Sequence, residues 1–485
     1  MKPTVSIVWF RLDLRLADNP ALQAALHRGE VVPVFIHAPV EEGPWQPGGA
    51  SNWWLHQSLR ALDSRLRELG SRLIIRRGAV LETLRGLVKE TNADAVFWSR
   101  RYEPAVIARD RIVKEALTGD GLIVESFNAA LLHEPWTIQN QSKKPFQVFT
   151  PFWKHCLAKP DPSEPLPEPE NLPAPSKWPR SLALDELELE PKLNWQDGLR
   201  VAWQPGEAGA IENLNRFLSK AFDEYTDQRN RPDLTGTSRL SPHLHFGEIS
   251  PRQVWHGLRQ MASKRGLPPE RWRASQFLSE IGWREFSHHL LFHFPHTPTE
   301  PLREDFKKFI WNKDATWLRA WQKGRTGYPI VDAGMRELWT TGWMHNRVRM
   351  IVASFLVKDL LIDWQEGARW FWDTLVDADL AQNTLGWQWT AGCGADAAPY
   401  FRVFNPTSQG EKFDPHGNYV RKWCPELAKL SDKWLHQPHA APDEILRAAG
   451  LEIGKNYPHP VVSHATAREL ALEAFAQIKA RAVNA

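Results

Sequence analysis

The first 130 residues alternate short apolar runs with amphipathic segments, and no other feature constrains the fold as much. The apolar runs are VSIVWF, VVPVFIHA, RLIIR, DAVFWS and LIVESF. The segments between them have helical spacing, and one of them opens with Asn19-Pro20, a typical N-cap followed by proline in the first turn. This order predicts a doubly wound α/β domain with a parallel sheet of about five strands and helices on both faces. That fold hosts many functions, so it predicts no chemistry by itself.

The pattern changes further along the chain. Residues 159–192 contain nine prolines and eight acidic residues without a sustained period, which predicts an extended linker. From about Gly206 apolar residues recur at helical spacing, as in the stretch AGAIENLNRFLSKAFDEY, and no convincing strand follows. The chain is also longer than one core usually supports. We predict an α/β domain over residues 1–135, an interdomain linker over 136–205 and an all-helical domain over 206–485.

Cysteine usage and the first apolar run bear on the compartment. Cys156, Cys393 and Cys424 are odd in number and widely spaced, which favours neither a disulfide framework nor a zinc site. The first apolar run is interrupted from Arg11 onward, too early for a signal peptide or a membrane span. These features predict a cytoplasmic protein with no membrane partner.

The net charge of +3 hides an uneven distribution. Residues 159–192 hold eight acidic against four basic residues, so that the rest of the chain carries a clear basic excess. This excess is compatible with a nucleic-acid partner, although a modest excess usually means only a solvated surface.

Tryptophan is unusually frequent, with 25 Trp against six Tyr. The stretch DADLAQNTLGWQW, from Asp377 to Trp389, combines two carboxylates, an amide and two indoles. Indoles can fill a core, or they can serve chemistry that needs an oxidisable ring; the composition leaves both open.

Two further stretches have the composition of a ligand site. The loop GTSRLSPHLHFGEIS offers hydroxyls, backbone N–H groups and Arg239 to a pyrophosphate, although a plain capped loop before a helix at Ser250-Pro251 explains it as well. A helix that starts near Trp343 would place Asn346 and Arg349 on one face with a methionine, either toward a cofactor or toward water.

Two other patterns are weak. GCGADA at Gly392 matches a dinucleotide-binding fingerprint but follows no strand, so we do not expect that site. Glu285, His289 and His293 share a helical face, and His288 and His296 lie beside them, but no second ligand group stands nearby in the sequence. We therefore predict no metal site.

Five stretches resemble the flavin-binding domain of the photolyase/cryptochrome family. They are TSRLSPHLHFGEISPRQVW, FLSEIGWREFSHHLL, GYPIVDAGMREL, TGWMHNRVRMIVASFLVKDLLIDW and ADLAQNTLGWQWTAGCGADAAPYFRVFNPTSQGEKFD. They occur in the family's order, and the opening WFRLDLRLADNPAL extends the resemblance to nearly the whole chain. SNWWLHQSL and VDAGMRELWTTGWMHNRVRMIVASF are most similar to the class III cyclobutane pyrimidine dimer (CPD) photolyases.

The resemblance implies a fully reduced, U-shaped FAD in the helical domain. The residues that match the family's phosphate-binding positions are Tyr225, Thr237, Ser238, Arg239, Leu240 and Ser241. Those that match the rest of the flavin site are Glu280, Arg284, Asn346, Arg349, Asp377, Asp379 and Asn383. The resemblance also implies an electron relay from Trp387 beside the flavin through Trp364 to Trp311 at the surface. Trp372, Trp317 and Trp321 form either a branch of the relay or core packing.

The implied reaction is light-driven repair of UV-damaged DNA. Reduced FAD would give an electron to a flipped-out CPD, the cyclobutane ring would split, and the electron would return; extruding the damaged pair costs roughly a few kcal/mol. By resemblance Glu280 bonds the pyrimidine edge, Met350 forms the floor of the pocket, and Trp283 and Trp389 form its walls. With Asn346 and Asn383, Glu280 and Met350 make the predicted catalytic set. The residues that match positions near the DNA backbone are Arg229, Arg347, Arg402 and Gln409.

Three features favour CPD repair within the family. The positions of Asn346 and Met350 hold histidine in the (6-4) photolyases, and plant cryptochromes typically have aspartate in place of Asn383. The chain also stops soon after the helical domain, without a long signalling tail. The alternative is a cryptochrome-type blue-light photoreceptor without repair activity.

The family often carries a second, light-harvesting chromophore in the α/β domain. Class III members are similar in using methenyltetrahydrofolate (MTHF), which we therefore expect here, although a deazaflavin or an empty site remains open. Ala105 and Val106 stand where class I proteins have the Asn-Glu pair that contacts the pterin, so the class I site is not expected. We further expect a monomer.

Overall fold

The computed structural model of the protein describes residues 4–192, 194–397 and 402–483. Residues 398–401, inside the last of the five family-like stretches, lie outside the described residues. The chain divides into two compact units. The first unit comprises residues 1–220, 238–295 and 376–380, and the second comprises 221–237, 296–375 and 381–485. The domain limits at residues 135 and 205 stay a prediction.

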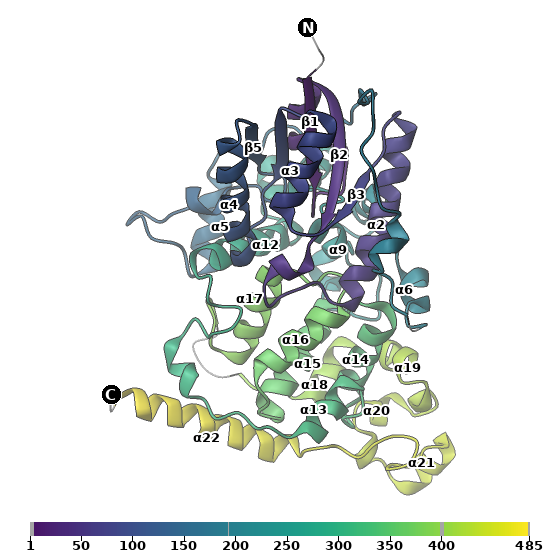
Figure 1. Cartoon of the computed structure of the whole chain (residues 1–485). Coiled ribbons are helices and arrows are strands. Elements are labelled where there is room, and N and C mark those ends of the chain that lie inside the picture. Colours follow the sequence, from purple (N-terminus) through teal and green to yellow (C-terminus); the bar gives the residue numbers. More distant parts are fainter. Residues whose placement is uncertain (1–3, 193, 398–401, 484–485) are drawn as a thin grey trace. The chain divides into compact units, whose positions relative to one another are not determined.

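The five predicted strands form one parallel sheet in the first unit (Figure 1). They are β1 (Thr4–Phe10), β2 (Gly29–His37), β3 (Ile74–Arg77), β4 (Ala95–Ser99) and β5 (Ile123–Phe127). Their order is β3-β2-β1-β4-β5, and Trp9 of β1 pairs with Val34 of β2 and Trp98 of β4. The chain winds outward from β1 in both directions, so the α/β prediction is confirmed.

Helices cover both faces of this sheet. They are α1 (Pro20–Leu26), α2 (Gly49–Glu68), α3 (Val80–Thr91) and α4 (Pro104–Gly119). Alternate strand residues such as Ile7 and Trp9 pack in one apolar cluster with Val80 of α3 and Val113 of α4. The helix α1 contacts β1, β2, β4 and β5, and its buried residues lie outside that cluster, so it covers the opposite face. The predicted cap is present, because Asn19 accepts a hydrogen bond from the backbone N–H of Leu22 at 3.1 Å.

The proline-rich segment is extended, as predicted, and it packs against the sheet domain. Its one regular element within residues 159–192 is a 3-10 turn, η3 (Leu184–Leu187). Leu172 and Leu187 are buried, and the carbonyl of Pro173 accepts a hydrogen bond from the N–H of Val31 in β2. The segment therefore belongs to the first unit, where hydrogen bonds and buried side chains hold it against the sheet domain.

The rest of the described chain is helical. The remaining helices of the first unit are α5 (Phe149–Leu157), α6 (Asp197–Ala202), α7 (Glu207–Lys220), α9 (Ser241–His245), α10 (Pro251–Lys264), α11 (Pro269–Arg273) and α12 (Gln276–His293). Those of the second unit are α8 (Tyr225–Gln228), α13 (Ala315–Gln322), α14 (Pro329–Thr341), α15 (Asn346–Ser354), the π-helical turn η5 (Phe355–Asp359), α16 (Trp364–Thr374), α17 (Leu380–Ala391, whose first residue belongs to the first unit), α18 (Pro406–Phe413), α19 (Asn418–Trp423), α20 (Asp432–Leu435), α21 (Asp443–Ala449) and α22 (His464–Val483). Past residue 206, the described part of the chain shows only two isolated β-bridges.

The stretch AGAIENLNRFLSKAFDEY contains more than one element, because α7 ends at Lys220 and the following residues form i→i−3 turns that keep a similar apolar spacing. One predicted helix limit is wrong. The next helix after α14 begins at Asn346 rather than near Trp343, because Gly342 takes a left-handed conformation that ends α14 and His345 caps α15 through its Nδ1. Within the described residues, we find no helix whose length and apolar character would let it span a membrane.

Candidate functional site

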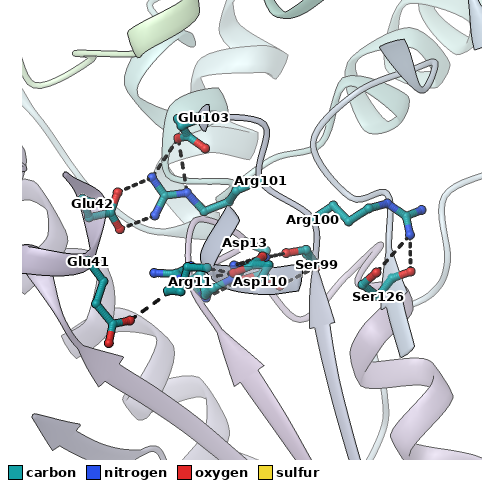
Figure 2. A network of polar contacts seen from close by, with 11 residues as sticks. Arg11, Asp13, Glu41, Glu42, Ser99, Arg100, Arg101, Glu103, Asp110 and Ser126 are labelled. Atoms are coloured by element: carbon teal, nitrogen blue, oxygen red, sulfur yellow. Dashed lines mark hydrogen bonds and ion pairs between the residues drawn. The ribbon is translucent and has the colours of Figure 1, made fainter. Parts of the chain in front are cut away.

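Charged side chains fill the carboxyl ends of β1 and β4, where a doubly wound sheet usually offers its ligand crevice (Figure 2). Arg101 donates to both carboxylate oxygens of Glu42, at 2.6 and 2.8 Å, and to Glu103 at 2.7 Å. Burial alone would raise the pKa of Glu103, but the Arg101 guanidinium outweighs it and lowers that pKa to about 2. Arg11 pairs with Asp110 at 2.6 Å. The carboxyl ends of β1 and β4 are thus followed by ion pairs between side chains.

The two positions matched to the class I pterin contacts lie in the first turn of α4. Val106 is buried and Ala105 is half-buried. Neither side chain can donate or accept a hydrogen bond.

The loop expected to hold phosphate leads into α9 in the first unit. Arg239 has a left-handed backbone, with φ of 54°, and its guanidinium lies 4.1 Å from the centre of the Trp203 ring. Leu240 is buried, whereas Ser238 and Ser241 are half-buried. Tyr225 and Thr237, the other two predicted members, belong to the second unit, where the Arg229 guanidinium lies 5.8 Å from the Tyr225 ring.

Three predicted residues share one side of α12, since they are spaced by three and four residues. Glu280 is half-buried and accepts a hydrogen bond from Gln276 at 2.8 Å. Trp283 stacks one ring face on Phe149, with ring centres 3.8 Å apart. Arg284 is buried and donates to the carbonyls of Ala130 and Leu244, at 2.5 and 3.4 Å. Within the described residues the Nε of Arg284 has no hydrogen-bond partner.

The two predicted acidic residues, Asp377 and Asp379, lie just before α17, and both are buried. Asp379 lies between two imidazoles. Its Oδ2 is 3.4 Å from Nε2 of His288 and 3.6 Å from Nδ1 of His245. Burial opposes ionisation of Asp379, but His288 and His245 outweigh it and hold the pKa of the carboxyl well below its usual value.

Sequence reasoning did not find these two histidines as partners of Asp379. His288 entered only as a neighbour of the weak metal pattern. Two residues of that pattern bind backbone groups in the structure. Glu285 accepts hydrogen bonds from the N–H groups of Leu132 and His133, and His289 accepts one from the N–H of Phe146. Burial lowers the pKa of His289 to about 3. In the part of the chain that the structure describes, no group of three or more acidic, histidine or cysteine side chains could hold a metal ion.

The helix α15 carries the predicted polar face in the second unit. Asn346 is exposed, and Arg349 and Met350 are half-buried. Arg349 donates through Nε to the carbonyl of Met344 at 2.7 Å. Arg347 donates twice to the side-chain oxygen of Asn230, at 3.1 and 2.7 Å. Burial, followed by the nearby charge of Arg229, lowers the pKa of Arg347.

The three tryptophans of the predicted relay differ in burial. Trp387 in α17 and Trp364 at the start of α16 are buried, whereas Trp311 is half-buried beside Phe309. Trp387 packs against α16 at Gly367, one turn beyond Trp364, where an added Cβ would lie 2.0 Å from the indole. This close approach fixes the indole on α16.

Asn383 lies one turn before Trp387 on α17 and is half-buried. Its side-chain nitrogen donates to the carbonyl of Ala368 at 3.0 Å, so its side-chain oxygen is left as an acceptor on the opposite side of the amide.

The remaining residues predicted to lie near DNA belong to the second unit. Arg402 is exposed, and Gln409 of α18 and Trp389 of α17 are half-buried. Their side chains are therefore at least partly open to a ligand.

Two protein families match the chain. Residues 6–170 match the DNA photolyase family, and residues 277–477 match the family described as the FAD binding domain of DNA photolyase. The chain belongs to the photolyase/cryptochrome family. It therefore carries an FAD-binding domain of the photolyase type, as the motifs predicted.

Individual relatives cover the chain from end to end. The deoxyribodipyrimidine photo-lyase of Agrobacterium fabrum is 50% identical, over 99% of this chain and 99% of that protein. Cryptochrome-1 of Arabidopsis thaliana is 44% identical, over 98% of this chain and 70% of that protein. The crystal structure of a class III photolyase from Agrobacterium tumefaciens aligns with a TM-score of 0.95 and 49% identity, over 99% of this chain and 98% of that chain. The predicted class III resemblance is thus supported by both sequence and fold.

The side chains of this chain fit an FAD cofactor. The buried Nε of Arg284 still has a proton to donate, which an anionic or carbonyl-rich ligand can accept. The oxygen of Asn383 can accept from a ring N–H, and the ionised Asp379 can accept from ribityl or ribose hydroxyls.

Proposed function

We propose that the protein is a light-driven DNA repair enzyme, a photolyase that splits cyclobutane pyrimidine dimers. The end-to-end identity with a protein named deoxyribodipyrimidine photo-lyase supports this proposal, as does the photolyase-type FAD-binding domain. FAD, when bound and reduced, would supply the photoexcited electron that opens the cyclobutane ring and would accept it back, so that no net oxidation occurs.

Asn383 is the observation that carries repair over signalling. An amide at this position, held by the carbonyl of Ala368, is neutral at every pH and offers one fixed acceptor to the flavin ring. The aspartate typical of plant cryptochromes can instead take up a proton. The amide therefore favours a flavin that stays reduced and available for repair.

FAD would be held by the residues expected from the motifs. Arg239 and the hydroxyls of the loop 237–241 suit the phosphates, with Tyr225. Arg284, Arg349, Asp377, Asp379 and Asn383 supply charges and hydrogen bonds for the rest, together with Asn346 and Glu280. Trp387, Trp364 and Trp311 would conduct electrons inward from the surface when the cofactor must be reduced.

The dimer would be recognised by shape and by a few polar contacts. The half-buried rings of Trp283 and Trp389 would offer apolar walls, Met350 would offer a polarisable floor, and Glu280 would offer a carboxyl for the pyrimidine edge. Arg229, Arg347, Arg402 and Gln409 would bind the phosphate backbone and position the duplex without reading its sequence.

Three further assignments belong to this proposal. We propose MTHF as the antenna chromophore, held by residues other than Ala105 and Val106, because those two side chains lack hydrogen-bonding groups. We also propose that the enzyme acts as a monomer and in the cytoplasm.

A second candidate is a blue-light photoreceptor that does not repair DNA. The 44% identity with Cryptochrome-1 of Arabidopsis thaliana favours it. The experiment that separates the two is illumination of the purified, reduced protein with dimer-containing oligothymidine. Repair predicts recovery of the thymine absorbance band in the light and none in the dark. A protein whose flavin responds to light while that band stays unchanged would be the photoreceptor, and the repair proposal would be wrong.

A further inference from the structure

The carboxylate of Asp379 is bracketed by histidines from two helices. His288 belongs to α12, and His245 is the last residue of α9. Their ring nitrogens lie 3.4 and 3.6 Å from the same oxygen of Asp379. All three residues belong to the first unit, and His288 and Asp379 are buried, at 8% and 7% exposure. The arrangement is therefore a closed network within one compact body.

The partners of His288 fix its protonation state. Its Nδ1 lies 3.0 Å from the backbone carbonyl of Arg284, and its Nε2 faces the Asp379 carboxylate at 3.4 Å. The backbone carbonyl can only accept a hydrogen bond, and so can the carboxylate of Asp379, whose pKa is held well below its usual value by His288 and His245 despite burial. Each ring nitrogen of His288 must therefore carry a proton. An imidazole with a proton on both nitrogens is a cation. The two contacts of His288, together with an ionised Asp379, thus assign a buried imidazolium beside a buried carboxylate.

The other charged groups around His288 do not reverse this assignment. Burial and the guanidinium of Arg284 both lower the pKa of His288, but Asp379 outweighs them and raises it above the ordinary value. Glu285, next to Arg284 on α12, is buried and receives backbone N–H groups. On the side of β4, the Tyr102 ring meets the His288 ring edge-on with centres 6.2 Å apart, and the charge of Glu103 acts on Asp379. His245 is the last titratable group around this pair, and its Nδ1 lies 3.6 Å from Oδ2 of Asp379.

We infer that His288 is a positioning residue for the flavin: as an imidazolium it holds the Asp379 carboxylate in one orientation, and FAD affinity therefore depends on the protonation of His288. The inference rests on the proposed function, in which Asp379 contacts FAD. As pH rises through the raised pKa of His288, Nε2 loses its proton and faces the carboxylate as a second acceptor. Asp379 then loses its fixed orientation, so FAD binding weakens toward alkaline pH.

Three variants test the inference. His288→Gln removes the charge, His288→Arg keeps a permanent charge, and His289→Gln is the matched control. His289 is the next residue on α12, is buried and neutral, and accepts a backbone N–H that glutamine can also accept. The FAD dissociation constant is measured from the fluorescence of released flavin between neutral and alkaline pH. Histidine ring NMR on the wild-type protein, assigned by the signal missing in His288→Gln, reports the pKa of His288 directly.

Wild type and His289→Gln should bind FAD less tightly as the His288 ring titrates, with a midpoint above the ordinary histidine value. The affinity of His288→Gln should be about tenfold lower at neutral pH, as for a lost hydrogen bond to a charged group, and should not vary with pH. His288→Arg should bind tightly without the alkaline loss.

Two results would overturn the inference alone. One is a His288 ring that titrates at or below the ordinary value, and the other is a His288→Gln protein whose pH profile equals that of wild type. A wild-type protein that binds no FAD at any pH would instead overturn the proposed function, and the inference with it. The His288 ring signal is missing in His288→Arg as well, so that variant gives the same NMR assignment if His288→Gln folds poorly.

Discussion

Trp387, the predicted relay residue beside the flavin, is closely packed on several sides. Its ring meets Phe371 edge-on at 5.0 Å and Trp321 at 6.2 Å, and it leaves Gly367 no room for a side chain. A ring fixed on all these sides cannot rotate away from its neighbours, which suits a residue that exchanges electrons over short distances.

Trp387→Phe should abolish light-driven reduction of oxidised FAD, because phenylalanine is not readily oxidised. Repair by protein whose flavin is already reduced should remain close to wild type, since the relay is not used in that reaction. Flavin absorbance during illumination and thymine absorbance during repair measure the two. Trp434→Phe in α20, outside the predicted relay, is the control. Equal loss of both activities in Trp387→Phe would contradict the relay role.

Single residues of the site were predictable where a motif carries them, and not where their partners lie far along the chain. Asp379 and Asn383 belong to a contiguous family-like stretch, so the sequence alone pointed to them. The pairing of Asp379 with His245 and His288 joins segments about 130 and about 90 residues apart, respectively, and no local spacing encodes it. For the same reason the sequence could not show what Glu285 and His289 of α12 do, which is to accept hydrogen bonds from backbone N–H groups of the segment 132–146.

At the scale of elements, the contact between α16 and α17 positions Trp364 and Trp387, two of the three residues of the predicted relay. Trp364 and Gly367 lie one turn apart on α16, and Trp387 and Asn383 lie one turn apart on α17. The hydrogen bond from Asn383 to Ala368 joins the two helices at the same level. A shift of α16 would therefore move both the amide and the indole.

Gly367→Ala should lower the free energy of unfolding by about 1–3 kcal/mol, because the new methyl group overlaps the Trp387 ring. It should also slow FAD photoreduction by displacing the indole. Thermal denaturation and flavin absorbance measure the two effects. Gly386→Ala is the matched control, since it lies in α17 with no atom within 4 Å of its Cβ, and it should stabilise by about 0.5–1 kcal/mol. Equal stability of the two variants would refute this packing argument.

Elements of the sheet were predicted better than the limits of the helices. The strand β4, for example, is apolar from Ala95 to Trp98 because both sheet faces are buried, and this short apolar run is a clear strand signal. The start of α15, by contrast, depends on the left-handed Gly342 and on the ring nitrogen of His345. A histidine cap is not a common start signal, so the apolar spacing alone placed the helix start three residues early.

At the scale of the whole molecule, binding to DNA should follow the distribution of charge. The affinity for a dimer-containing duplex should fall as salt is added, because phosphate contacts release counterions. Arg402→Gln should reduce the slope of log affinity against log salt by about one. Arg369→Gln is the control, because Arg369 is exposed and already paired with Glu366 on α16. Fluorescence anisotropy at several salt concentrations measures the slope, and an unchanged slope for Arg402→Gln would remove that residue from the DNA contacts.

The way in which the chain alternates between its two units affects its folding during synthesis and its response to protease cleavage. The chain passes from one unit to the other after residues 220, 237, 295, 375 and 380. The short segment 376–380, which contains Asp377 and Asp379, belongs to the first unit although both of its flanking segments belong to the second. Neither unit is a continuous length of polypeptide, so separately expressed halves should not fold, and synthesis must run past residue 380 before the first can close. A single protease cut between residues 296 and 375 should consequently leave the two fragments associated until denaturant is added, because each unit contains residues from both fragments.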